Sequence, residues 1–75
     1  MNITFFGPLT DVTGSTRVEW DDIPDTDTLR ERLERSFPGL QDRKFLLSVN
    51  NKIVRDNTTL QSSSEVALLP PFSGG

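Results

Sequence analysis

Apolar and β-branched residues are grouped in short runs near both ends of the chain, and these runs predict strands. Residues 3–6 are rich in β-branched and aromatic side chains and end at Gly7 and Pro8, which indicates a first strand. Residues 15–20 alternate polar and apolar positions, as a strand with one buried face does. A loop that closes at Gly14 separates the two strands, so we expect them to pair as a hairpin.

The middle of the chain has the apolar repeat of a helix. The stripe consists of residues spaced by four positions: Leu29, Leu33 and Phe37. Thr28 and Glu31 have the spacing of a capping box, in which the Thr28 hydroxyl accepts a hydrogen bond from the Glu31 amide, so we expect the helix to begin at this cap. Pro38 and Gly39 are expected to end it, and residues 21–27 before it are expected to form an acidic loop.

Strand patterns return in the second half of the chain. Residues 45–49 and 52–54 flank Asn50 and Asn51, which tolerate the left-handed backbone of a tight hairpin turn. Residues 65–69 form the last predicted strand.

The order of these elements predicts an α+β fold. One helix between two strand-rich halves favours a mixed sheet with the helix packed across a single face, which is the arrangement of the β-grasp fold. A ferredoxin-like fold would need a second helix, for which the chain has no room. We therefore expect one domain over residues 1–69 and a flexible tail over residues 70–75, whereas the order of the strands in the sheet does not follow from the sequence.

Composition excludes several classes of function. The chain has 75 residues, with neither cysteine nor histidine, so Ser-His and Cys-His nucleophile pairs and thiolate metal sites are excluded. A net charge of −3 argues against a nucleic-acid-binding face. No apolar run approaches the roughly 20 residues of a membrane span, and the cytoplasm is the expected compartment.

Three groups of polar side chains are better explained as surface than as sites. The four carboxylates of the acidic loop lack the spacing of a calcium loop, and the helix arginines fit a solvated charged face. The run 62–64 of three serines is expected to be a turn rather than a nucleophile, because no histidine base accompanies it. The acidic and basic residues in question are Asp21, Asp22, Asp25, Asp27, Arg30, Arg32 and Arg35.

The end of the chain has the composition of an extended tail. Pro70 and Pro71 lack amide donors and fix φ, so the tail is expected to leave the fold as a polyproline II segment. Gly74 and Gly75 have no Cβ and can enter a cleft too narrow for other residues. Such an end suits either carrying a group on the terminal carboxylate or attaching that carboxylate to another molecule.

The last strand also predicts a partner surface. Leu68 and Leu69 are adjacent, so their side chains point to opposite faces, of which the helix can cover only one. Phe72 follows the prolines and is expected to lie outside the core. Apolar side chains grouped beside a tail indicate contact with another protein.

Along its whole length the chain resembles the small subunits of molybdopterin synthase, within the ubiquitin-like sulfur-carrier family. Residues 3–7 resemble the opening strand of that family, and residues 47–54 resemble its Val-Asn hairpin. Residues 65–75 are the most specific element, with a Glu-Val strand, Pro-Pro, a bulky residue and a final Gly-Gly. The serines at 62–64 depart from the Asp-Gly-Asp that the family often has, which leaves the type of that turn open, because serine resists a positive φ.

This resemblance implies a carrier whose partners supply the catalytic side chains. Gly75 would be adenylated by an ATP-dependent, E1-like activating enzyme, and a sulfur donor would turn the acyl-adenylate into a thiocarboxylate. The tail would then enter the large subunit of molybdopterin synthase, in a heterotetramer, where sulfur passes to the pterin precursor. No bound cofactor or metal is expected. The resemblance assigns tail passage and partner binding to Gly74, Ser73, Phe72, Pro71, Pro70 and Leu69.

Three alternatives to this function remain. A ubiquitin-like protein modifier would use the same activation but would end in an isopeptide bond between Gly75 and a lysine. A thiamin-pathway sulfur carrier would share the Gly-Gly end, although such carriers usually lack the Phe-Phe opening and the Pro-Pro. A non-covalent binding module would tolerate loss of Gly75.

Overall fold

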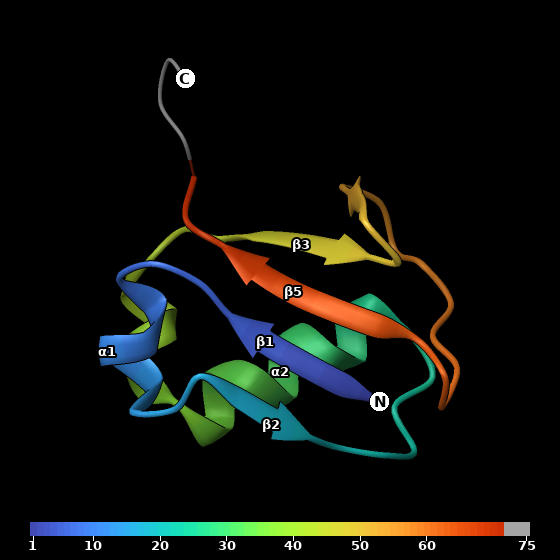
Figure 1. Ribbon diagram of the computed structural model, residues 1–75, viewed down its shortest axis with the longest axis horizontal. Coiled ribbons are helices and arrows are strands. Elements are labelled where there is room, and N and C mark those ends of the chain that lie inside the picture. Colours follow the sequence, from blue (N-terminus) through green and yellow to red (C-terminus); the bar gives the residue numbers. More distant parts are fainter. Residues whose placement is uncertain (72–75) are drawn as a thin grey trace.

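Residues 1–71, the part of the chain that the computed structural model describes, form a five-stranded mixed sheet with one main helix behind it (Figure 1). The elements, in chain order, are β1 (Asn2–Phe5), α1 (Leu9–Thr13), β2 (Arg17–Glu19), α2 (Thr26–Ser36), the 3-10 helix η1 (Pro38–Asp42), β3 (Leu46–Val49), β4 (Lys52–Val54) and β5 (Glu65–Leu69). The predicted α+β fold with one helix on one face of a mixed sheet is confirmed.

The strand order is β2-β1-β5-β3-β4, so the first and the last strand lie side by side in the middle of the sheet. They are parallel, with Phe5 opposite Leu68, whereas every other pairing in this sheet is antiparallel. A parallel pair needs a long crossover connection, and α2 lies within it. The predicted hairpin of β1 and β2 is confirmed, as is the hairpin of β3 and β4.

The start of α2 differs from the predicted capping box. The helix begins at Thr26, and its N-cap is Asp25, whose carboxylate accepts a hydrogen bond from the Thr28 amide at 2.9 Å. Asn57, from a distant loop, accepts a second hydrogen bond from the Asp27 amide at 2.9 Å. Because these two side chains satisfy the free amides of the first turn, Thr28 lies inside the helix and the prediction of a cap at Thr28 is wrong.

The segment expected to be a loop between β1 and β2 contains the short helix α1. Its Leu9 is buried, and Gly14 ends it with φ +72° and an amide that donates to Thr10 O at 2.8 Å. The helix α1 has five residues, and only one of them is buried. Such a short helix has no repeat of apolar positions by which the sequence could reveal it. The main helix α2 ends at Ser36 before Pro38, and the next element, η1, lies beside α1 and buries Leu40.

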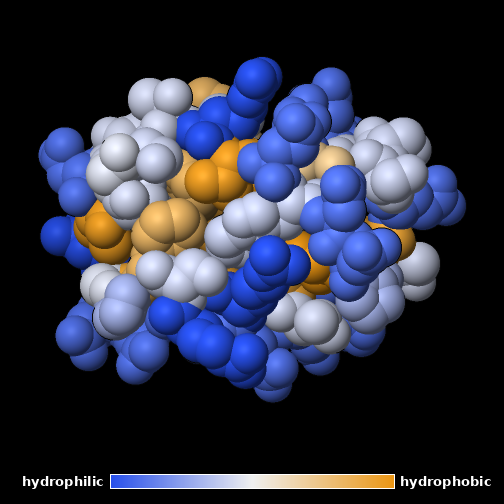
Figure 2. Space-filling view, turned by 90° about the horizontal axis from the view of Figure 1, so that it is seen from below, coloured by the Kyte–Doolittle hydropathy of each residue, from blue (hydrophilic) through white to orange (hydrophobic). Residues whose placement is uncertain are grey.

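The apolar stripe of α2 packs against the sheet as predicted. Leu29 and Leu33 are fully buried, and Phe37 follows the last turn. The Phe37 ring meets Phe5 edge-on at 5.6 Å between centroids and stacks on Trp20 at 6.1 Å. The view from below (Figure 2) shows apolar residues in small areas among hydrophilic ones, because most large apolar side chains lie between sheet and helix.

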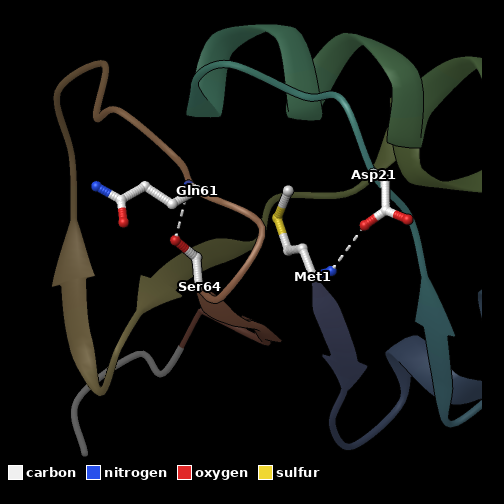
Figure 3. Close-up of polar contacts among 4 residues, drawn as sticks. All are labelled: Met1, Asp21, Gln61 and Ser64. Carbon is white, nitrogen blue, oxygen red and sulfur yellow. Dashed lines mark hydrogen bonds and ion pairs between the residues drawn. The ribbon is translucent and has the colours of Figure 1, made fainter.

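Two predicted turns and one terminal contact complete the fold. Asn50 and Asn51 take φ of 50° and 69°, the left-handed geometry predicted for this hairpin. At the serine turn, the Gln61 amide donates to the Ser64 hydroxyl at 2.9 Å, and the serines need no positive φ (Figure 3). The Met1 amino group lies 3.2 Å from the Asp21 carboxylate, so this member of the acidic loop has a structural partner (Figure 3).

Candidate functional site

Strand β5 separates a covered face of the sheet from an open one. Val66 and Leu68 point toward α2 and are buried, whereas Ala67 and Leu69 point to the other face and are partly exposed. The prediction that one of the two adjacent leucines lies on the uncovered side is therefore confirmed, and that residue is Leu69. The open face is the one turned toward the viewer in Figure 1, since α2 lies behind the strands.

The open face carries a hollow that is bordered by three large apolar side chains and by polar and charged ones, among them Arg17 and Glu65. Its floor is made of short side chains that pair across neighbouring strands: Thr4, Ala67 and Ser48. Phe6, Ile53 and Leu69 stand around this floor, and the hollow has a volume of about 570 Å³. We call these six residues the open-face surface. Phe6 is 47% exposed and Ile53 is 51% exposed, the two large apolar side chains most open to solvent among the described residues.

One of these border residues, Phe6, has a signal in the sequence that the predictions did not use. Phe5 and Phe6 are adjacent in the first predicted strand, as Leu68 and Leu69 are in the last. Because neighbouring side chains in a strand point to opposite faces, one of the two phenylalanines is expected on the open face. Phe5 is buried and Phe6 is exposed. Ile53 has no such signal, because it reaches this surface only through the pairing of β4 with Ser48 on β3.

The tail leaves the sheet beside this surface. Leu69 pairs with Leu46 in the last rung of the β3–β5 ladder, and the Phe6 amide donates to Leu68 O at 3.1 Å on the other side. Pro70 is half-buried and Pro71 is exposed. After the end of β5, the chain leads away from the sheet (Figure 1).

The predictions for the rest of the tail lie outside the described residues. Phe72, Ser73, Gly74 and Gly75 keep the roles expected from the sequence as predictions only. The described part of the site therefore consists of the open-face surface and the base of the tail at Pro70 and Pro71.

Three ionisable side chains at α2 and its N-cap make contacts within the fold: Asp25, Arg30 and Arg32. The hydroxyl and the amide of Thr28 hold the pKa of Asp25 below its ordinary value by hydrogen bonding to the carboxylate. The guanidinium of Arg30 lies 4.7 Å from the Phe45 ring centre, and that of Arg32 lies 4.5 Å from the Trp20 ring centre.

Neither a metal cluster nor a membrane-spanning helix occurs in the described chain. Across residues 1–71, no group of three histidine, cysteine or carboxylate side chains could hold a metal ion. No helix in the same range is long and apolar enough to cross a membrane.

Comparison with known proteins gives matches over nearly the whole chain. Residues 3–75 match the ThiS family. The molybdopterin synthase sulfur carrier subunit of Escherichia coli (strain K12) is 30% identical over 80 residues, with 100% of this chain and 99% of that protein covered.

Two solved structures extend these matches to the fold. The crystal structure of SAMP1 from Haloferax volcanii has a TM-score of 0.76 at 25% identity and covers 100% of this chain and 98% of that one. A protein–protein complex of subunits 1 and 2 of the molybdopterin-converting factor from Helicobacter pylori contains a chain with a TM-score of 0.73 at 26% identity, covering 99% of this chain and 96% of that one.

Proposed function

Because the chain belongs to the ThiS family, we propose that it is the sulfur carrier subunit of a molybdopterin synthase and that it carries sulfur on Gly75. The observation that carries this proposal is the position of the tail, which leaves the sheet next to the open-face surface in a chain with neither cysteine nor histidine. Such a chain can present a terminal group to a partner but can supply few catalytic side chains of its own.

The chemistry begins with activation of the Gly75 carboxylate. A carboxylate does not exchange oxygen for sulfur directly, because oxide is a poor leaving group. Attack of the carboxylate on the α-phosphorus of ATP releases pyrophosphate and gives an acyl-adenylate. Sulfide then attacks the acyl carbon, AMP leaves, and a thiocarboxylate remains. With a persulfide donor, a second thiol is needed to release the thiocarboxylate and leave a disulfide.

The open-face surface and the tail together provide the contact with the large subunit. A surface bordered by Phe6, Ile53 and Leu69 buries apolar area when a partner covers it, and the tail beside it then reaches into that partner. The complex of two subunits of the molybdopterin-converting factor from H. pylori, one of them similar to this chain, supports a partner of this kind. We expect the same surface to meet the activating enzyme, since both partners must receive the same tail.

The direct test of this function is formation of the thiocarboxylate. The purified chain is incubated with a molybdopterin-synthase-type activating enzyme, ATP and sulfide, and the intact mass is measured. We expect the mass of the chain to increase by the difference between one sulfur atom and one oxygen atom. This increase should require ATP and should be absent in a chain that lacks Gly75. An unchanged mass under conditions that convert a known carrier would contradict it.

A second candidate is a ubiquitin-like protein modifier. The similarity to SAMP1, named as a small archaeal modifier protein in the structure of its Methanosarcina acetivorans counterpart, favours this candidate. The activation step is the same, but the acyl group ends on a lysine of another protein. Mass spectrometry of cell proteins digested with chymotrypsin separates the two. Cleavage after Phe72 leaves Ser-Gly-Gly on the target lysines of a modifier, whereas a pure carrier leaves no such remnant.

A further inference from the structure

One rung of the sheet crosses the open face through all five strands. Thr4 on β1 lies opposite Arg17 on β2 and opposite Ala67 on β5. Ser48 on β3 continues the rung, with Ala67 opposite it on one side and Ile53 on β4 opposite it on the other. The rung therefore runs from a cation at one edge of the sheet to an apolar side chain at the other edge, over three short side chains.

The neighbouring rungs place a charge of the opposite sign on the border of the same hollow. Glu65, opposite Asn2, lies at the start of β5, whereas Phe6 and Leu69 border the hollow on the side where the tail leaves. Among the described residues that line the hollow, Arg17 and Glu65 alone are charged, and both are exposed. Their strands are two apart in the sheet, which separates them sideways by about 10 Å. The cation, the anion and the apolar side chains thus occupy three different parts of the border.

Neither of these two charges is paired within the described fold. Arg30 and Arg32 of α2 lie over aromatic rings, so they have partners in the domain itself. In residues 1–71, by contrast, no ion pair involves Arg17 or Glu65. Both charged groups are therefore available to another molecule.

A partner that covers the hollow must deal with both charges. Covering Phe6, Ile53 and Leu69 also removes water from the charged groups beside them, and a charge that loses its water without gaining a partner is strongly unfavourable. A partner that fits therefore brings a carboxylate to Arg17, whose planar guanidinium suits that group, and a cation to Glu65. A partner turned the other way would place like charges together, which disfavours that orientation.

We propose that Arg17 and Glu65 determine how the large subunit is oriented on the open-face surface, by pairing with a carboxylate and a cation of that subunit. Both residues are specificity-determining rather than catalytic, since they act on docking of the folded domain. This inference rests on the proposed function, because it takes the large subunit as the partner.

The test reverses the two charges separately and together. The dissociation constant for the molybdopterin synthase large subunit of the same organism is measured with the full chain as wild type, Arg17→Glu, Glu65→Arg and the double variant. We expect each single reversal to weaken binding by about tenfold, because it places like charges opposite each other. The double variant should weaken binding by about 100-fold, because the two contacts are separate and their effects add in free energy.

The double variant separates local pairing from an effect of overall charge. Arg17→Glu makes the net charge of −3 more negative, Glu65→Arg makes it less negative, and the double variant restores it. If overall charge alone governs association, the two single variants have opposite effects and the double variant binds like the wild type. Arg35→Glu is the matched control, because it makes the same charge change on an exposed position of α2, behind the sheet. It should change the dissociation constant by about twofold or less.

Thermal melts establish that each variant folds, and Arg17→Gln and Glu65→Gln decide if a reversal does not. Each of these neutral variants should weaken binding by about fivefold, because it removes one charge from the contact. The inference is overturned if the variants bind like the wild type, or if the two reversals have opposite effects. It is also overturned if they disrupt only self-association of the chain, since the surface would then join two copies. If the wild type itself does not bind the large subunit, the proposed function fails as well.

Discussion

The two faces of the sheet differ in what covers them, although the same strands supply both. On the covered face Val66 and Leu68 of β5 pack under α2, and burial of their side chains stabilises the fold. On the open face Leu69 and Phe6 border a hollow that no element in residues 1–71 fills. Adjacent apolar residues, such as Phe5-Phe6 and Leu68-Leu69, therefore indicate that one face of the sheet packs in the core and that the other face carries exposed apolar side chains.

This difference gives each face its own expected response to mutation. Side chains on the covered face should matter for the free energy of unfolding, and side chains on the open face should matter for binding. The predictions below test this division, starting with the largest expected effect.

Leu33→Ala removes a fully buried side chain from the stripe of α2 on the covered face. We expect it to lower the free energy of unfolding by about 2–5 kcal/mol, the usual range for a leucine in a core. In a domain of this size such a loss could remove most of the stability. Chemical denaturation monitored by the single tryptophan, Trp20, measures it, and a loss of less than about 1 kcal/mol would mean that the helix face is wrongly assigned.

Leu68→Ala and Leu69→Ala are a matched pair on one strand. Leu68→Ala should cost about 2–5 kcal/mol of stability, because the side chain is fully buried. Leu69→Ala should cost about 1 kcal/mol or less, while weakening the complex with the large subunit. Denaturation and titration calorimetry on the two variants give both quantities, and equal stability losses would remove the distinction between the faces.

Phe72→Ala extends the open-face prediction into the tail. Its side chain is expected to contact the partner, so the variant should keep the melting temperature of the wild type and lose about 2 kcal/mol of binding free energy to the large subunit. A sharp drop in melting temperature would instead assign Phe72 to the core.

Asp25→Asn tests the smallest effect, at the N-terminus of α2. The pKa of Asp25 in the folded chain lies below its unfolded value, so the carboxylate stabilises the fold at neutral pH. That contribution is present above the unfolded pKa and is lost as the pH falls through the folded pKa. Asparagine still caps the helix but does not titrate. Between neutral pH and pH of about 3, Asp25→Asn should therefore lose less stability than the wild type, and identical pH profiles would exclude this role.

Strand positions and tight turns were predictable from the sequence because their signals are local. The run 65–69 agrees with β5, and the asparagine pair fits the turn between β3 and β4. The helix cap was mispredicted because the side chains of Asp25 and Asn57 form it. Asn57 accepts its hydrogen bond from the Asp27 amide, which lies 30 residues away in the sequence. A capping box is a pattern within four residues and cannot register such a partner.

The site was predictable only in part, for a similar reason. The alternation along residues 65–69 places Leu69 on the open face, but strand order alone brings it beside Phe6 and Ile53. The parallel pairing of β1 and β5 likewise joins residues near opposite ends of the chain. Nothing in either local sequence indicates it.

Transfer of sulfur by a chain that lacks Gly75 is the most direct test of the account. The deletion leaves a carboxylate on Gly74 but shortens the reach of the tail by at most about 3.3–3.6 Å, and a reaction that needs atoms within about 3–3.5 Å of each other cannot absorb this change. With purified activating enzyme, sulfide and large subunit, the deletion variant should keep the melting temperature of the wild type, bind the large subunit and form no molybdopterin. Gly75→Ala, which adds one methyl group, should be impaired less. Full molybdopterin formation by the deletion variant would contradict the carrier role and favour a non-covalent binding module.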